Sequence, residues 1–327
     1  MWVRVASLCA SLATASLVPL AAQGEASIRL VRGDAAVQVR VGDEPFAEYV
    51  FAGGSRPIVW PLLAPGGAAV TRAWPMQEEA GAAVDHPHQR SLWFAHGDVN
   101  GVDFWTEGDK AGRIEQTELV TAEVVADRGR IETRNRWSAP DGKVVCTDAR
   151  TFEFFMAGTM RGIDITVVIH ASHGALHFGD TKEGTMAIRL PRGLCFDRKE
   201  DPGHAYTSEG KNDGDAWGTR ARWIAYTGEV AGQAVGVVLM DHSANLRHPT
   251  WWHARDYGLL AANPFGRHDF EKARKGSGDF DLGAGETLTF RYRVLVFAGA
   301  FEREAIEASF GTFTKAPVSD LPQGRKR

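Results

Sequence analysis

Two histidines flank a proline near the start of a polar and aromatic segment, residues 85–105. Pro87 favours an extended conformation for the residue before it, so His86 and His88 are expected to project to the same side. Two imidazoles placed in this way can bind one metal ion or act as proton donor and acceptor. The alternative is that both bond only backbone groups in a packed loop. Candidate ligand-binding side chains in this segment are Arg90, Trp93, His96, Asn100 and Trp105.

A second segment of similar composition covers residues 245–269. Its candidates for proton transfer are His253 and Asp256. Adjacent tryptophans can offer one ring to a ligand and one to the core, and arginines can donate forked hydrogen bonds to carboxylate or vicinal hydroxyl groups. The alternative is a buried salt-bridge network under a long loop. Candidate ligand-binding residues here are Arg247, Trp251, Trp252, Arg255 and Asn263.

A third, shorter segment covers residues 179–184. Asp180 and Glu183 can supply acid–base chemistry there, and Lys182 can bind a ligand oxygen. The alternative is a plain surface turn.

The histidines also allow a metal hypothesis. His86 and His88, together with His253 or His268, would make a three-histidine site for a divalent transition metal such as zinc or copper. Such a site would support hydrolytic or oxidative chemistry.

Several common catalytic patterns do not occur in the sequence. There is no Gly-x-Ser-x-Gly, His-Glu-x-x-His, Walker loop or dinucleotide-binding Gly-x-Gly-x-x-Gly pattern. Neither Cys146 nor Cys195 has neighbours that would activate it as a nucleophile, and the sequence does not show whether they form a disulfide. A serine or cysteine triad therefore has no support.

The elements that would position these residues are mainly strands. Apolar and polar residues alternate in residues 37–41, 131–136 and 163–169, which predicts half-buried strands. Further strands are expected at residues 143–155, 185–190, 222–226, 234–240 and 287–297, and one helix at 301–310. Many short strands separated by turns predict an all-β fold, a large antiparallel β-sandwich. Residues 72–112 and 241–282 show no strand pattern and are expected to be long functional loops.

The composition is that of a globular protein, with 327 residues, 44% hydrophobic and 24% charged. A net charge of −4 without a basic block argues against nucleic-acid binding. Residues 1–23 combine Arg4, an apolar run and small residues, which predicts a signal peptide and a periplasmic or secreted protein. No later segment has transmembrane length. A single domain is expected at 24–314, followed by a flexible tail at 315–327.

The motifs described above resemble the signature of the DUF6807 family. The resemblance rests on residues 85–105 (DHPHQRSLWFAHGDVNGVDFW), 179–184 (GDTKEG) and 247–258 (RHPTWWHARDYG), and it covers nearly all of the chain after residue 23. The family has carried the label "methane oxygenase PmoA", but that name describes a membrane subunit, and this chain shows no spanning segment. A looser similarity, in the His-Pro steps, is to galactose-mutarotase-type sandwiches, which bind sugars on one sheet face.

Three functional hypotheses follow from these patterns. The first is an exported carbohydrate-active enzyme, a hydrolase, lyase or epimerase, in which His86, His88, Glu183, His253 and Asp256 transfer protons to and from a sugar or glycoside. The second is the histidine-ligated metal enzyme. The third is a sugar-binding protein without catalysis.

Overall fold

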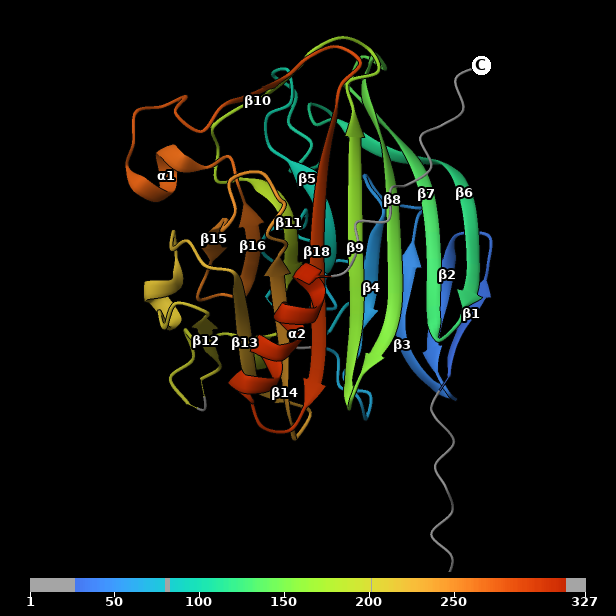
Figure 1. Ribbon diagram of the computed structural model, residues 1–327, viewed down its shortest axis with the longest axis vertical. Coiled ribbons are helices and arrows are strands. Elements are labelled where there is room, and N and C mark those ends of the chain that lie inside the picture. The colour runs from blue at the N-terminus through green and yellow to red at the C-terminus, as the bar shows by residue number, and fades with distance from the viewer. Residues whose placement is uncertain (1–26, 80–82, 201, 316–327) are drawn as a thin grey trace, which may run out of the picture.

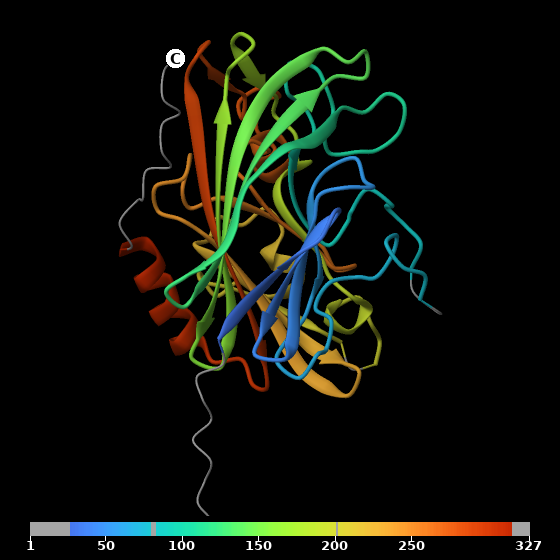
Figure 2. The same cartoon turned by 90° about the vertical axis from the view of Figure 1, so that its right-hand side faces the viewer.

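Two large antiparallel β-sheets pack face to face in the computed structural model, which describes residues 27–79, 83–200 and 202–315 (Figures 1 and 2). The predicted all-β sandwich is confirmed. The signal-peptide prediction lies outside the described residues, and so does the tail beyond Lys315. Within the described ranges, no helix combines the length and the apolar character needed to cross a membrane.

The first sheet contains eight strands in the order β1-β2-β3-β4-β5-β11-β16-β15. Three of them, β5, β15 and β16, lie in the stretches that the sequence predicted to be loops. Every residue of these three strands is buried, so their sequences do not alternate in the way that a half-exposed strand does. The bounds are β1 (Ile28–Arg32), β2 (Ala36–Val41), β3 (Glu44–Val50), β4 (Ile58–Leu62), β5 (Leu92–His96), β11 (Gly184–Arg189), β16 (Leu259–Asn263) and β15 (Trp251–Ala254).

The second sheet also contains eight strands, in the order β12-β13-β14-β18-β9-β8-β7-β6. It includes most of the strands predicted from alternation. The bounds are β12 (His204–Thr207), β13 (Trp223–Val230), β14 (Gln233–Asp241), β18 (Thr287–Ala298), β9 (Met160–His170), β8 (Val144–Ala157), β7 (Arg128–Ser138) and β6 (Arg113–Val125). A small separate pair consists of β10 (Leu176–Phe178) and β17 (Phe280–Leu282).

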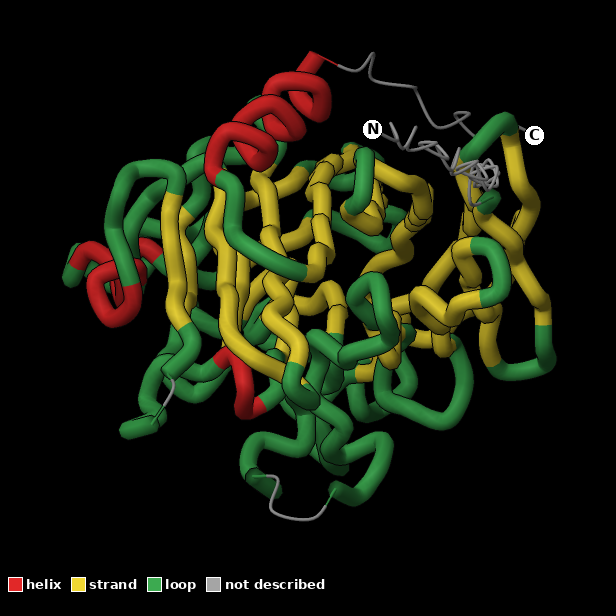
Figure 3. The backbone as a smooth tube through the Cα atoms, turned by 90° about the horizontal axis from the view of Figure 1, so that it is seen from below, coloured by secondary structure: helices red, strands yellow, loops and turns green. Residues whose placement is uncertain are grey.

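Helices are few and short. The predicted C-terminal helix is present as α2 (Arg303–Lys315) and packs on the outer face of the second sheet (Figure 3). Its residues Ile306, Phe310 and Phe313 belong to a buried cluster that includes Trp223. A five-residue helix and two 3₁₀ turns were not predicted. They are α1 (Arg267–Glu271), η1 (Arg192–Leu194) and η2 (Asp213–Ala216).

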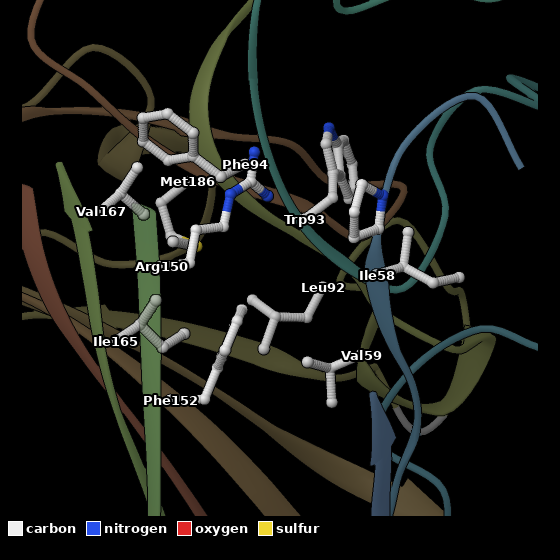
Figure 4. Close-up of a pocket in the computed structure, with 11 residues that line it drawn as sticks. Ile58, Val59, Leu92, Trp93, Phe94, Arg150, Phe152, Ile165, Val167 and Met186 are labelled. Atoms are coloured by element: carbon white, nitrogen blue, oxygen red, sulfur yellow. The ribbon is translucent and has the colours of Figure 1, made fainter. Parts of the chain in front are cut away.

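The main core between the sheets contains a buried ion pair. Asp148 accepts hydrogen bonds from Arg150, from the indole of Trp137 at 2.7 Å and from Asn135 at 2.5 Å. Arg150 borders a cavity of about 10 Å³, about the size of one water molecule, and lies among apolar side chains that include Phe94 (Figure 4). Cys146 and Cys195 are both free and buried, so they do not form a disulfide.

Candidate functional site

Four strands of the first sheet share a row of side chains on its outer face. Trp93, Ala187, Ala261 and His253 lie opposite one another across β5, β11, β16 and β15. Side chains alternate along a strand, so this row faces away from Phe94, whose ring packs against the second sheet. Ala187 and Ala261 in this row are both fully buried.

Asp85 is the centre of a charge cluster over this face. Its carboxylate accepts hydrogen bonds from Arg72, from Arg189 at 2.9 Å and from the Nδ1 atom of His86 at 2.8 Å. Partial burial opposes ionisation, but His86 and the two arginines hold the pKa of Asp85 down to about 2. Burial and the neighbouring charge of Arg189 lower the pKa of Arg72 to about 10. Asp85 is therefore ionised across the physiological pH range.

The imidazole of His86 lies flat against Tyr257. Their ring centroids are 5.3 Å apart with an interplanar angle of 6°, and the His88 ring meets His86 edge-on at 5.7 Å. The two histidines are neighbours as predicted, but the extended conformation was wrong. His86 has φ +43° and its carbonyl accepts the amide of Gln89, so the segment turns instead. A non-glycine residue held in this region is often found at a functional site.

Arginines from two directions fix the loop that carries His88. Arg56, buried, donates to the carbonyl of His88 at 3.2 Å, and Arg90 donates two hydrogen bonds to Glu107 at 2.8 and 2.9 Å. Burial and the charge of Arg56 lower the pKa of His88 to about 4, so its imidazole is neutral at pH 7. Arg90 was predicted to bind a ligand, but its guanidinium is already paired with Glu107.

Lys182 and Glu183 lie directly before β11. The Lys182 ammonium lies 3.3 Å from the Glu183 carboxylate. Burial nevertheless raises the pKa of Glu183 above its ordinary value. Burial also raises the pKa of Tyr257, and the carboxylate of Glu183 adds to that rise. The charge of Asp103 acts to raise the pKa of both His88 and Glu183.

His253 is buried at the edge of this site. Its Nδ1 atom donates to the carbonyl of Lys182 at 3.0 Å, and burial lowers its pKa to about 3. Arg255 lies over Tyr257, with its guanidinium carbon 5.4 Å from the centroid of the tyrosine ring. Asp256 is exposed, and its carboxylate accepts the amide of Tyr257.

The four tryptophans predicted to bind a ligand are buried. Trp93 and Trp105 pack against each other with ring centroids 5.0 Å apart, and both are buried. Trp252 is also fully buried, and Trp251 donates to Glu271 at 3.0 Å and packs under Arg220. These tryptophans stabilise the sheet and its loops.

Four other predicted binding residues hold the backbone together. Arg247 donates hydrogen bonds to the carbonyls of Pro264, Gly278 and Asp279. The side chain of Asn263 donates to the carbonyl of Thr181 and accepts from the amides of Phe265 and Gly266. The other two bond the backbone in and around β10. His96 bonds the carbonyl of Gly179. Asn100 donates to the carbonyl of Ala175 and accepts from the amide of His177.

The metal candidates do not converge. Nδ1 of His268 bonds the carbonyl of Ala273, and His253 is occupied by Lys182, which leaves only His86 and His88 as neighbours. The part of the chain that the structure describes contains no group of three or more His, Cys, Asp or Glu side chains able to hold a metal ion.

A cleft of about 530 Å³ opens beside this cluster. Asp85 and Tyr257 line it together with the two arginines that bind Asp85, and so do residues of η1 and of the segment that follows it. The sequence did not single out Arg72, Arg189, Arg56, Glu107 or Tyr257. Tyr257 lies within the second polar segment, and the arginines reach Asp85 and His88 through tertiary contacts that the sequence does not show.

The family of the chain is decided by its match to a family model over residues 36–311, described as a family of unknown function, DUF6807. The chain belongs to this family. The resemblance predicted from residues 85–105 and 247–258 is thereby confirmed. Among curated proteins, no sequence matches that of this DUF6807 protein.

Solved structures of carbohydrate-active enzymes are similar to the DUF6807 chain at a low level. A GH36 α-galactosidase from Geobacillus stearothermophilus in complex with raffinose is 13% identical to this chain, with a TM-score of 0.35. The match covers 85% of this chain and 41% of the α-galactosidase chain. A galactose mutarotase-related enzyme from Lactobacillus acidophilus has 10% identity, TM-score 0.27 and coverage of 84% and 98%. The chain thus spans about two fifths of the α-galactosidase. TM-scores below 0.5 carry no argument about the site.

Proposed function

We propose that this protein is an enzyme that acts on a sugar or glycoside by acid–base chemistry at the cluster around Asp85. The observation that carries the proposal is the Asp85–His86 pair. Two arginines keep the carboxylate ionised, and the carboxylate accepts Nδ1–H of His86 and so orients the ring. The Nε2 atom of the half-exposed imidazole is then the nitrogen that exchanges protons with a ligand.

Glu183 supplies the complementary group. A carboxyl whose pKa is raised by burial retains its proton to higher pH and can donate it to a leaving or ring oxygen. His86 and Glu183 would then act as base and acid, and the neutral His88 would accept or donate a hydrogen bond beside them.

The lining of the adjacent cleft supports a hydroxyl-rich ligand. Arginine and carboxylate side chains and Tyr257 line the cleft together with apolar residues such as Ala83, Leu190 and Val230. A ligand with many hydroxyl groups can satisfy such donors and acceptors, whereas an apolar ligand would leave them unpaired.

The test uses turnover of a panel of mono- and disaccharides and aryl glycosides by the mature protein. His86→Gln and Glu183→Gln are each expected to lower kcat/KM by about 100-fold or more while the protein stays folded. His173→Gln, at an exposed histidine outside the cluster, is the control. Turnover that both site variants retain would rule out the assignment, and sugar binding without turnover would favour the non-catalytic alternative.

Export is a separate proposal and rests on the residue pattern of positions 1–23. N-terminal sequencing of protein recovered from the periplasm or medium is expected to start near residue 24. Recovery only in the cytoplasm with residue 1 or 2 as the N-terminus would contradict it.

A further inference from the structure

We infer that the ligand of the 530 Å³ cleft carries an anionic group, so that within the proposed function the substrate is an acidic sugar rather than a neutral one. The inference rests on the location of the proposed active site, because the same Asp85 and Tyr257 line the cleft. It specifies that the ligand is negatively charged, whereas the acid–base proposal does not specify the charge of the ligand.

The deep end of the cleft contains more positive than negative charge. Arg72 and Arg189 are 5% and 2% exposed, and they share the single carboxylate of Asp85. The nitrogen Nε of Arg189 has no hydrogen-bond partner among the described residues. Two buried guanidinium groups on one carboxylate leave one positive charge uncompensated, and a buried charge is screened little by salt.

A third arginine extends this charge along the cleft. Arg198 lines the cleft after η1, and its side chain makes no hydrogen bond or ion pair with the described residues, so its guanidinium is available to a ligand. Arg192, in the same wall, is already paired with Asp197. A guanidinium with unused donors binds carboxylate and phosphate groups in a forked geometry.

Acidic side chains also line the cleft, but they lie at its rim. Glu229 and Asp197 are exposed, as is Glu79. Exposed charges act through water and are screened over about 8–10 Å at physiological salt. The buried arginines therefore dominate the potential at the deep end, where the anionic group of the ligand would lie.

The experiment is isothermal titration of the mature protein with three matched probes: glucose, glucuronate and glucose 6-phosphate. We expect at least one anionic probe to bind about 10-fold or more tightly than glucose. Stronger binding of glucuronate identifies a carboxylate ligand, and stronger binding of glucose 6-phosphate identifies a phosphorylated one.

Two variants test whether the preference for an anionic probe depends on Arg198. Arg198→Gln is expected to lower the affinity of the preferred anionic probe by about 5-fold without changing the affinity for glucose or the Tm. Arg274→Gln, which removes an exposed charge that does not line the cleft, should change neither affinity. Equal binding of all three probes, no binding of either anionic probe, or equal losses in both variants would overturn the inference.

These outcomes separate the inference from the proposed function. Tight anionic binding without turnover would support the charge requirement and remove the catalytic proposal. Turnover that depends on His86 but shows no preference for anionic substrates would retain the catalytic proposal and remove the charge requirement.

Discussion

At the scale of single residues, the environments of the histidines differ in a way that the sequence does not show. His86 is half-exposed and paired with Asp85, whereas His96 and His253 are buried and bond backbone carbonyls. Burial lowers the pKa of His96 to about 4 and that of His253 to about 3. The latter two are therefore neutral structural groups, and His86 is the histidine suited to proton exchange.

The buried histidines predict acid-sensitive stability. In the unfolded chain these imidazoles bind a proton below about pH 6.5, but in the folded protein they stay neutral until the pH reaches their lowered pKa. Stability is thus fully present above pH 6.5 and is lost as the pH falls. Between pH 6.5 and 5 each such histidine should lower the free energy of unfolding by about 2 kcal/mol, as measured by denaturant titration.

A matched pair of variants isolates this effect from the titration of carboxylates. His253→Gln keeps a donor for the Lys182 carbonyl and should flatten the pH dependence, whereas His173→Gln should leave it unchanged. The same pH dependence in the His253 variant and in the wild type would show that this residue does not contribute.

At the scale of elements, the sequence predicted those strands that have one exposed face. β2, β7 and β9 alternate, and α2 shows an apolar side, so their positions are close to the predicted ones. β5 and β16 are buried on both faces and read as uniform apolar runs, so they were assigned to loops. His96 at the end of β5 was singled out because of its residue type.

Partners that are distant in sequence could not be found in this way. Arg189 is 104 residues from Asp85, and nothing in its own neighbourhood distinguishes it from a surface arginine. Tyr257 was passed over because its contact with His86 arises only when β11, β15 and β16 bring the two polar segments together.

The loop that follows α1 has a position where only glycine fits. A Cβ atom at Gly278 would lie 1.8 Å from the carbonyl oxygen of Phe265 and 2.6 Å from the carboxylate of Asp180. Gly278→Ala should therefore lower the free energy of unfolding by about 1–3 kcal/mol in denaturant titration. Gly311 in α2 has open space around its Cα atom, so Gly311→Ala should be neutral or stabilise by up to about 1 kcal/mol. Equal effects of the two substitutions would contradict this description of the loop.

At the scale of the whole molecule, the residues that stabilise the core lie apart from the residues proposed to carry out acid–base chemistry. The buried pair of Asp148 and Arg150 lies between the sheets, and the Asp85 cluster lies on the outer face of the first sheet. Substitutions at the buried pair are therefore expected to change stability and to leave the acid–base groups in place.

Arg150→Met leaves the carboxylate of Asp148 buried without its cation, which should lower the free energy of unfolding by about 3–5 kcal/mol. The double variant Asp148→Asn/Arg150→Met removes both charges and should be more stable than the single variant. A double variant less stable than Arg150→Met would show that the ion pair is not the source of the loss. Activity per folded molecule should stay within about 3-fold of the wild type in both.

The measurement that tests the central claim most directly is a crystal structure of the protein with the sugar that binds most tightly in the titrations. The predicted result is a ligand in the cleft beside Tyr257, with an oxygen within hydrogen-bond distance of His86 Nε2 and another near the Glu183 carboxyl group. A ligand bound elsewhere, for example in the separate cleft of about 300 Å³ lined by Arg32, Phe51 and Gln116, with the Asp85 cluster untouched, would contradict the account.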